Sequence, residues 1–426
     1  MRITIPVLFC IVTLSLQAQS VDKLKVIANQ QFRSNRYQEA MDYYERIHKL
    51  EPHDPSIHFK YAFCLFQIQR YQQAAREFDL LVQEEVLMDS ALFYLGLSLK
   101  TQSNYRKADS IFRTAFAIIP KNSPLSTRIL FERQGCLLAL NQEGTSNTEL
   151  TAIGAVNSDT HDFGAVQNPV TGEFVITTSR KLSKKQVYDG QYGSYLPDLL
   201  CYAGDWGPCT YFKSLNTRWS EGTGSFSHEG ESFYYTSCRK DASCEIFVTH
   251  LLPTGDWSPP IRLNGNINTT GSDSKHPMIA RSGDSLFFSS NRPGGQGGMD
   301  IWMSVREPSG PWLTPVNLGA RVNTSANEIT PWYTSTSGVL IFSSSGHPGY
   351  GGFDLYAAAD PFGTETKVYN LGAPFNSPFD ESYFSLGAFG TLSSNRKESQ
   401  FDIYRFEIVD QRMQIRRFLR QAALVD

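Results

Sequence analysis

The spacing of apolar residues changes twice along this 426-residue chain. An uninterrupted apolar run from Ile3 to Leu16 stands at the start. Segments of helical character follow, and from about Glu149 strands and turns replace helices. There, short runs of β-branched and aromatic residues recur every 50 to 60 residues, as in F-V-I-T-T-S, S-F-Y-Y-T-S, S-L-F-F-S-S and V-L-I-F-S-S. These patterns predict a short leader, a helical domain and then an all-β domain.

The first apolar run has the features of a secretory signal peptide. Arg2 precedes the run, and the small residue Ala18 follows it, which places cleavage near Ala18. The run is short for a membrane span, and no later segment is apolar over the length that a span needs. Cys10 follows the bulky Phe9 inside the run, which disfavours lipidation. We therefore expect residues 1–19 to be a signal peptide and the mature chain to be exported without crossing a membrane.

The helical region repeats with a period of 34 residues. Three sets of equivalent positions show it: Tyr37, Tyr71 and Tyr105; Ala40, Ala74 and Ala108; and Tyr44, Phe78 and Phe112. Residues 20–145 resemble tetratricopeptide repeats, with units near Val21–Asp54, Pro55–Met88 and Asp89–Asn122. The resemblance implies stacked pairs of antiparallel helices forming an α-solenoid, with an apolar helix within residues 123–142 as its cap.

In that family the first helix of each unit lines a concave groove. The corresponding positions here form an unusually apolar face for a groove exposed to solvent. We interpret this face as a surface that binds a partner peptide or helix, and the alternative is that it packs on the rest of the chain. The residues of the face are Lys25, Asn29, Phe32, Phe59, Phe63, Phe66, Phe93 and Leu97.

The β region contains five copies of one unit. Each copy has an Asn followed five residues later by an acid: Asn157 and Asp162, Asn216 and Glu221, Asn268 and Asp273, Asn323 and Glu328, Asn376 and Glu381. A strand ending like F-x-S-S follows in each copy. Another acid then opens the next strand, namely Asp198, Glu245, Asp300, Asp354 or Asp402. Five copies, each with room for four strands, predict a β-propeller over residues 149–410.

The units P-V-N-L-G-A-R-V-N-T-S-A-N-E-I-T-P and V-L-I-F-S-S-S-G-H-P-G-Y-G-G-F-D-L-Y are similar to WD-repeat-like propeller modules of periplasmic proteins related to TolB. The strand L-T-A-I-G-A-V before Asn157 could complete the last blade and close the ring, which favours five blades. Six blades, as in TolB, is the alternative if the insertion near Lys184–Leu196 hides a blade. The basic, amphipathic tail of residues 411–426 predicts a short helix.

The glycine-rich stretch N-R-P-G-G-Q-G-G-M-D-I-W, Asn291–Trp302, is a hairpin rather than a phosphate loop. A strand rather than a helix follows it, and the spacing fits neither G-x-G-x-x-G nor G-K-[ST]. We expect its glycines to permit positive φ and Trp302 to pack between blades. The acids that open the strands are interpreted as acceptors for turn amides rather than as calcium ligands. These turn residues are Asp198, Glu245, Asp300, Asp354 and Asp402.

Two close cysteine pairs are candidate disulfides in an exported chain: Cys201 with Cys209, and Cys238 with Cys244. No H-E-x-x-H or G-x-S-x-G motif occurs, so no catalytic residue, metal ligand or cofactor is predicted. The net charge of −3 carries no electrostatic signature of nucleic-acid binding.

Helical repeats followed by a propeller resemble the N-terminal part of envelope proteins that continue into an OmpA-like peptidoglycan-binding domain, some of them linked to type IX secretion and gliding. The resemblance implies a non-enzymatic periplasmic scaffold for envelope proteins, with association at the outer membrane. An alternative is a propeller that binds a glycan or small ligand, which would need exposed aromatic residues such as Trp206, Trp312 and Trp332. A propeller hydrolase is the more distant alternative.

Overall fold

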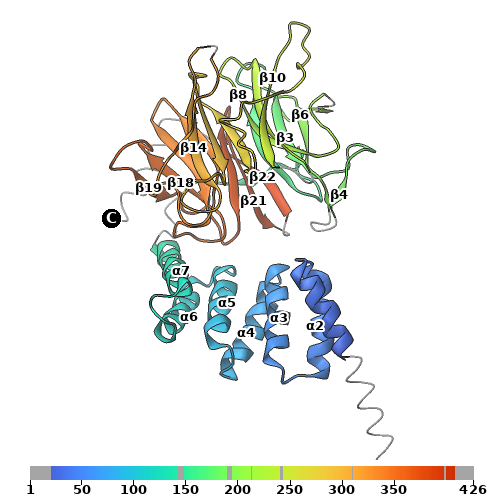
Figure 1. Ribbon diagram of the computed structural model, residues 1–426, viewed down its shortest axis with the longest axis vertical. Coiled ribbons are helices and arrows are strands. Elements are labelled where there is room, and N and C mark those ends of the chain that lie inside the picture. The colour runs from blue at the N-terminus through green and yellow to red at the C-terminus, as the bar shows by residue number, and fades with distance from the viewer. Residues whose placement is uncertain are drawn as a thin grey trace, which may run out of the picture. The chain divides into compact units, whose positions relative to one another are not determined.

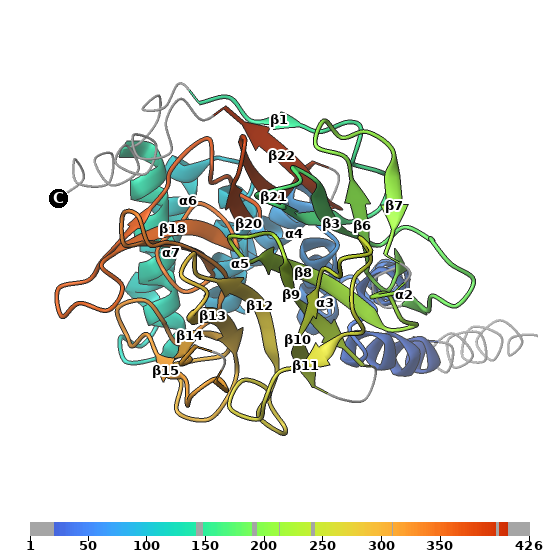
Figure 2. The same ribbon diagram turned by 90° about the horizontal axis from the view of Figure 1, so that it is seen from above.

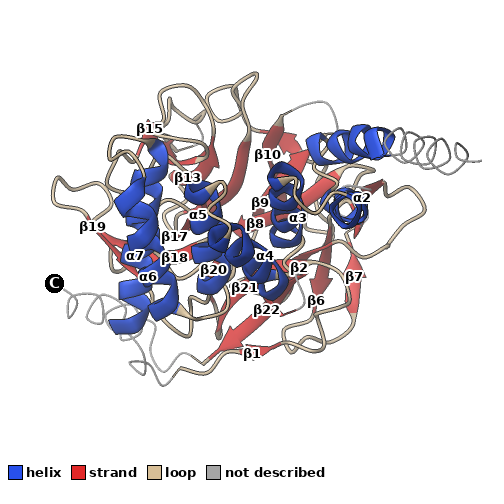
Figure 3. Cartoon of the chain, turned by 90° about the horizontal axis from the view of Figure 1, so that it is seen from below, coloured by secondary structure: helices blue, strands red, loops and turns tan. Residues whose placement is uncertain are grey.

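The computed structural model describes residues 21–141, 148–189, 194–212, 214–239, 243–308, 310–397 and 400–407. The chain divides into two compact units, Met1–Leu137 and Leu138–Asp426. The described helices all precede the strands along the chain, as the colours of Figure 1 show. Figure 3 distinguishes the helices from the strands by colour. The predicted signal peptide, residues 1–19, and the predicted tail helix, residues 411–426, lie outside the described residues.

The first unit is built from antiparallel helices, as tetratricopeptide repeats require. Its described helices are residues 21–33, α2 (Tyr37–Leu50), α3 (Pro55–Gln67), α4 (Tyr71–Gln83), α5 (Met88–Lys100), α6 (Tyr105–Ile118) and α7 (Pro124–Asn141). These seven helices confirm the predicted repeats, and α7 lies within the segment predicted to be the cap. None of the described helices combines the length and apolar character that crossing a bilayer requires.

Small residues and capping groups determine where these helices begin and how closely they pack. Asp54 precedes α3 and accepts hydrogen bonds from the backbone N–H groups of Ser56 and Ile57, which satisfies donors at the helix start. A Cβ added at Gly96 would lie 2.5 Å from the ring of Phe112. The period of 34 residues is therefore maintained by packing, because each repeat needs the same small residue where its helices approach.

The second unit consists of five four-stranded antiparallel sheets, the blades, and a separate two-stranded hairpin. Blade 1 contains β2 (Asp162–Gln167), β3 (Phe174–Thr178), β6 (Asp198–Tyr202) and β7 (Cys209–Tyr211). Blade 2 contains β8 (Ser220–Phe226), β9 (Ser232–Cys238), β10 (Cys244–His250) and β11 (Ile261–Arg262). Blade 3 contains β12 (Ser274–Ile279), β13 (Ser285–Ser290), β14 (Asp300–Val305) and β15 (Val316–Asn317). Blade 4 contains β16 (Glu328–Thr334), β17 (Val339–Ser344), β18 (Asp354–Ala359) and β19 (Lys367–Asn370).

Blade 5 joins the two ends of the propeller sequence. It contains β20 (Glu381–Leu386), β21 (Gly390–Lys397), β22 (Gln400–Phe406) and, as its outer strand, β1 (Thr151–Ala152). Thr151 lies opposite Arg405, and the N–H of Ile153 donates to the carbonyl of Ile403 at 3.0 Å. The N-terminal strand thus closes the ring, which confirms the five-bladed prediction.

The insertion in blade 1 forms a hairpin of its own. Its strands are β4 (Tyr188–Asp189) and β5 (Ser194–Tyr195), which pair only with each other. The six-blade alternative is therefore wrong, because this segment supplies two short strands instead of a four-stranded sheet.

Apolar residues between neighbouring blades form the core of the propeller. One buried cluster joins Tyr234 and Val248 of blade 2 to Phe288 and Trp302 of blade 3, so Trp302 packs between blades as predicted. Equivalent clusters join the other consecutive blades. The inner strands β2, β8, β12, β16 and β20 each contact the inner strands of both neighbouring blades. Figure 2 shows the blades arranged in a ring with these inner strands towards the centre.

Candidate binding site at the propeller channel

Every inner strand of the propeller is interrupted by a β-bulge. The register shifts between Phe163 and Val166 in β2, and at corresponding places in β8, β12, β16 and β20. Three non-glycine residues at these bulges have positive φ, namely His276 (54°), Thr330 (51°) and Tyr383 (53°). This backbone conformation costs about 1 kcal/mol or more for each of them. The same strained conformation occurs at the bulges of three inner strands. The surrounding packing therefore holds these residues in position.

Hydroxyl groups from neighbouring blades hold the bulges. Ser393 Oγ accepts from the backbone N–H of Gly164 at 3.0 Å. Thr236 Oγ1 accepts from the N–H of His276 at 3.0 Å, and Thr330 Oγ1 accepts from the N–H of Tyr383 at 3.3 Å. Each of these bonds joins a bulge to the preceding blade around the ring. The channel is therefore preformed, and its wall does not depend on a ligand for its shape.

A cavity of about 240 Å³ lies at this level. All five inner strands line it, through residues 164–167, 224–226, 276–279, 330–334 and 383–386. This is slightly below the usual range for sites that bind drug-sized ligands, which begins at about 300 Å³. The cavity therefore suits a side chain, a short peptide segment or one sugar ring.

The cavity wall carries aromatic groups that are uncharged at neutral pH. The rings of His276 and Tyr383 meet edge to face with centroids 5.6 Å apart, and Phe163 stacks on Tyr383 at 5.2 Å. Burial, with a smaller effect of Lys275, lowers the pKa of His276 to about 3. Burial also raises the pKa of Tyr383. These two side chains thus offer neutral hydrogen-bonding groups against apolar surface.

The described residues that line this cavity include no Asp, Glu or Cys. Glycoside hydrolysis in most families uses a pair of carboxylates that flank the bond to be cleaved. His276 is a weak base here because its pKa is lowered to about 3. The described wall of the cavity therefore offers groups for binding and, among the residues that the structure describes, shows no carboxylate pair.

Only one of three tryptophans considered for ligand binding faces the cavity. Trp332 is half-buried and lines it. Trp312 is only 4% exposed, and the guanidinium of Arg306 lies 4.6 Å from the centre of its ring. Trp206 stacks on Phe174 with ring centroids 4.2 Å apart. Trp312 and Trp206 therefore belong to the packing of the blades.

The five repeated Asn residues tie each linker to the blade before it. Each side-chain amide donates to the carbonyl and accepts from the N–H of one strand residue, at distances of 2.7 to 3.0 Å. The pairs are Asn157 with Ile403, Asn216 with Leu199, Asn268 with Ile246, Asn323 with Ile301, and Asn376 with Leu355. Each amide pairs with the strand residue as the backbone of a neighbouring strand would. These side chains therefore have a structural role, and other residues line the cavity.

The acid that follows each Asn caps the same linker in four blades. Glu328 accepts from the N–H and hydroxyl of Thr324 at 2.7 and 2.8 Å, and Asp162, Glu221 and Glu381 are placed alike. Blade 3 differs, because Ser274 lies at the corresponding register position, opposite Ser290. Asp273 is half-buried and forms an ion pair with Lys275 at 3.0 Å. The linker of blade 3 is one residue longer, which a count of five residues from the Asn could not reveal.

The acids that open the third strands hold turns in two clear cases. Asp300 accepts from the N–H groups of Gln296 and Gly297, and Asp354 accepts from those of Tyr350 and Gly351. At the same strand position of blades 1 and 5, Asp198 is fully buried and Asp402 is half-buried.

The prediction that Glu245 is one of these turn acids is wrong. It lies opposite Ser237, and its carboxylate forms an ion pair with Arg262 at 2.5 Å. Cys244 takes the place of the acid, opposite Cys238. The prediction fails because the hairpin of blade 2 is held by sulfur rather than by a carboxylate.

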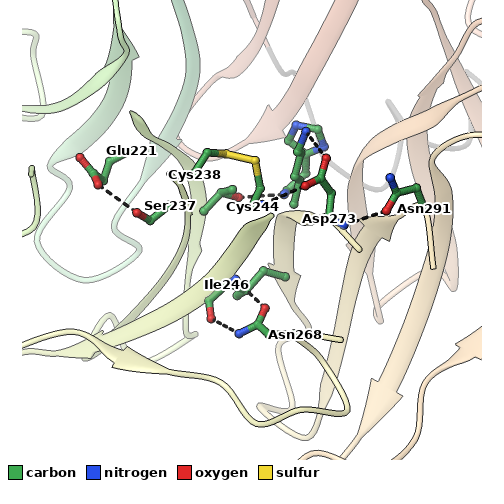
Figure 4. The surroundings of a disulfide bond; sticks show 11 residues. Glu221, Ser237, Cys238, Cys244, Ile246, Asn268, Asp273 and Asn291 are labelled. Carbon is green, nitrogen blue, oxygen red and sulfur yellow. Dashed lines mark hydrogen bonds and ion pairs between the residues drawn. A yellow bond between two sulfur atoms is a disulfide. The ribbon is translucent and has the colours of Figure 1, made fainter. Parts of the chain in front are cut away.

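Figure 4 shows the disulfide between Cys238 and Cys244, whose sulfur atoms are 2.06 Å apart. It joins the ends of β9 and β10. The other candidate disulfide is not formed, because Cys201 is a free thiol. Cys201 lies opposite Thr210, and Cys209 lies opposite Tyr202, so the strand register does not place the two cysteines as partners.

The glycine-rich loop before Asp300 fastens blade 3 to blade 4. Gly294 alone among its glycines has positive φ, at 91°. A Cβ added at Gly297 would lie 2.3 Å from the carbonyl oxygen of Thr324, and the N–H of Gly298 donates to the carbonyl of Ala326 at 2.7 Å. Close approach to the next blade, more than positive φ, therefore explains the glycines.

The residues assigned to the predicted groove of the helical repeats make contacts with their neighbours. Lys25 forms ion pairs with Glu51 at 2.5 Å and Asp54 at 3.3 Å, and Asn29 accepts from Tyr44 and Lys60. None of the residues assigned to the face is exposed, and all except Phe93, which is buried, are half-buried: Lys25, Asn29, Phe32, Phe59, Phe63, Phe66 and Leu97.

Aromatic packing between repeats partly buries this face. Phe59, Phe63 and Phe66 surround Tyr94 with ring centroids 5.2 to 5.9 Å apart. Phe93 is only 8% exposed and contacts Tyr94, so of the assigned residues it offers the least surface to a partner. The family pattern predicts this face from the sequence, and the aromatic rings of the face pack against the next repeat.

Comparisons with known proteins match part of the chain to one family and find similar solved structures. Residues 31–92 match the tetratricopeptide repeat family. A search of the curated proteins found no match. Among solved structures, the chain is similar to TolB from Acinetobacter baumannii, with 14% identity and a TM-score of 0.35. It is also similar to β-1,2-mannobiose phosphorylase from Listeria innocua, with 12% identity and a TM-score of 0.41.

These likenesses cover unequal parts of the proteins. The TolB match covers 59% of this chain and 56% of TolB. The phosphorylase match covers 67% of this chain and 96% of the enzyme. We take no activity from either protein, and the propeller assignment rests on the sheet topology. The tetratricopeptide repeats themselves imply protein partners.

Proposed function

We propose that this protein is a non-enzymatic scaffold of the bacterial cell envelope, exported to the periplasm, that binds partner proteins with the outer membrane as its working location. The observation that carries the proposal is the channel cavity lined by all five inner strands, whose described residues offer aromatic and hydroxyl groups, next in sequence to a module that implies protein partners. The disulfide between Cys238 and Cys244 supports export, because disulfides persist in oxidising compartments.

The cavity is suited to an uncharged segment of a partner. Its aromatic and hydroxyl groups offer apolar contact with a few hydrogen bonds, and Arg281 at the edge is exposed. A preformed wall lowers the ordering cost that binding must overcome. A loop or chain end of an envelope protein would fit the space of about 240 Å³.

The test is recovery of partners from the cell envelope after crosslinking. Met278→Trp would fill the cavity, whereas Val316→Trp introduces the same side chain on the outer strand β15, where Val316 is 61% exposed. We expect the unmodified chain and the Val316→Trp variant to retain one stoichiometric envelope partner, and Met278→Trp to lose it. Equal recovery with both variants would show that the cavity is not the binding site.

Glycan binding is the second candidate, and one observation favours it. Trp332 and Tyr333 are both half-buried and line the cavity beside hydroxyl groups, an arrangement that can hold a sugar ring. Absence of a protein partner, together with a higher melting temperature in the presence of envelope oligosaccharides, would support this alternative. Product formation from such oligosaccharides would instead support the hydrolase alternative.

A further inference from the structure

Three metal-ligating side chains from successive helices meet inside the helical unit. His48 lies in the last turn of α2, His58 in the first turn of α3, and Glu77 on α4. One nitrogen or oxygen atom from each lies within 4.8 Å of the others. The two imidazole rings stack with centroids 4.4 Å apart and an interplanar angle of 30°. Figure 1 shows the three helices as neighbours in the solenoid.

The hydrogen bonding of this group is incomplete. His58 Nε2 lies 2.9 Å from Glu77 Oε2, whereas the Nδ1 of His48 is buried without a hydrogen-bond partner among the described residues. A buried polar atom left unpaired costs about 1–3 kcal/mol. The His58 side chain is 5% exposed and that of Glu77 is 25% exposed, so the group is partly shielded from water. An unpaired nitrogen beside two other ligand atoms indicates a missing binding partner.

Two rings pack against the imidazole of His48. The ring of His58 stacks on it with centroids 4.4 Å apart, and the ring of Tyr61 stacks with centroids 6.1 Å apart. A neutral imidazole offers one ring nitrogen with a free electron pair, which is the form that binds metal ions.

We propose that His48, His58 and Glu77 form a binding site for a divalent transition-metal ion of the Zn²⁺ class. Two imidazoles and one carboxylate are a known zinc donor set, with ligand distances of about 2.0–2.2 Å and a fourth position for water. Calcium and magnesium prefer oxygen ligands, so the two imidazoles disfavour them.

The ion would join the first two repeats. His48 belongs to the second helix of the first repeat, and His58 and Glu77 belong to the two helices of the second. The metal would replace the hydrogen bond between His58 and Glu77, because both side chains become its ligands. The three ligand atoms need to converge by about 1 Å, which side-chain rotation can supply.

The experiment titrates ZnCl₂ into the tag-free, full-length chain after chelator treatment, by calorimetry. We expect one Zn²⁺ per chain, an increase in melting temperature, and no comparable response to Mg²⁺ or Ca²⁺. Co²⁺ should give the visible absorption of a four-coordinate site. His48→Gln and Glu77→Gln should each weaken Zn²⁺ binding by at least about tenfold.

His53→Gln is the matched control, because His53 is exposed in the connection between α2 and α3 and belongs to no such cluster of described residues. It should bind Zn²⁺ as the unmodified chain does. Circular dichroism of each variant checks its folding, and Glu77→Gln preserves the size of the side chain if His48→Gln proves unstable. Absence of Zn²⁺ binding by the unmodified chain, or equal binding by folded Glu77→Gln, would overturn the proposal.

Discussion

Asn157 and Ile403 exchange two hydrogen bonds although 246 residues separate them. The side-chain amide of Asn157 donates to the carbonyl of Ile403 at 2.9 Å, and its oxygen accepts from the N–H of Ile403 at 2.8 Å. The same pairing recurs in the other four linkers, but only here does it join the start of the propeller to its last strand. The short strand β1 is therefore held to β22 by these two hydrogen bonds of the following linker as well as by its own strand pairing.

Replacement of this amide should weaken closure of the ring. Asn157→Ala removes two hydrogen bonds and leaves the backbone groups of Ile403 without these partners. We expect the free energy of unfolding to fall by about 1–3 kcal/mol. Urea unfolding of the full chain measures this change. Ser335→Ala, at an exposed position in the loop after β16, is the control and should change stability little. An equal, small effect of both variants would contradict the role assigned to the tie.

The disulfide of blade 2 should contribute measurable stability. Cys238→Ser with Cys244→Ser opens a loop of 6 residues. The chain-entropy relation gives a loss of about 2 kcal/mol for so short a loop. Reductant should lower the melting temperature of the unmodified chain to that of the double variant, and should leave the double variant unaffected. Cys201→Ser is the control, since Cys201 is a free thiol. Reductant without effect on the unmodified chain would contradict the prediction.

His276 should make the propeller less stable in acid. Its pKa is lowered to about 3 in the folded state, against about 6.5 in an unfolded chain. Between these values the unfolded state binds the extra proton, so the free energy of unfolding falls as pH decreases from about 6.5 towards 3. One proton gives a slope of at most about 1.4 kcal/mol per pH unit.

The contribution of His276 is obtained as a difference between two curves. Other buried groups also titrate, so unfolding of the unmodified chain and of His276→Gln is measured across the same pH range. We expect the variant to lose stability less steeply below pH 6.5. Parallel curves for the two proteins would show that His276 takes up its proton in the folded state as readily as in the unfolded one.

The repeat periods predicted the fold because each repeat must reproduce the same contacts. Ala40, Ala74 and Ala108 are all fully buried where helices approach, and the strand before Asn157 was identified as the closing strand from its likeness to its counterparts. Periodicity reports such recurring contacts directly, so both domains and the number of blades could be inferred from sequence.

Details that depend on strand register could not be inferred in the same way. Glu245 lies one residue after the position of the turn acid, because the hairpin of blade 2 is short. Asp273 lies one residue before the position of the linker acid, because the linker of blade 3 is long. The cavity residues come from five strands and depend on bulges. A weak signal existed, since His276 and Thr330 each precede a proline within a strand, and prolines inside strands often mark bulges.

The glycine-rich loop of blade 3 should tolerate no side chain at Gly297. A Cβ there would lie 2.3 Å from the carbonyl oxygen of Thr324 and 2.5 Å from the backbone carbon of Ser325, and backbone atoms cannot rotate away. We expect Gly297→Ala to lower the free energy of unfolding by about 1–3 kcal/mol, because the loop must move away from blade 4. Gly265→Ala is the matched control, since a Cβ at Gly265 would meet nothing within 4 Å and its φ is not positive. Differential scanning calorimetry compares the melting temperatures of the two variants. Equal melting temperatures would mean that the loop does not pack tightly against blade 4.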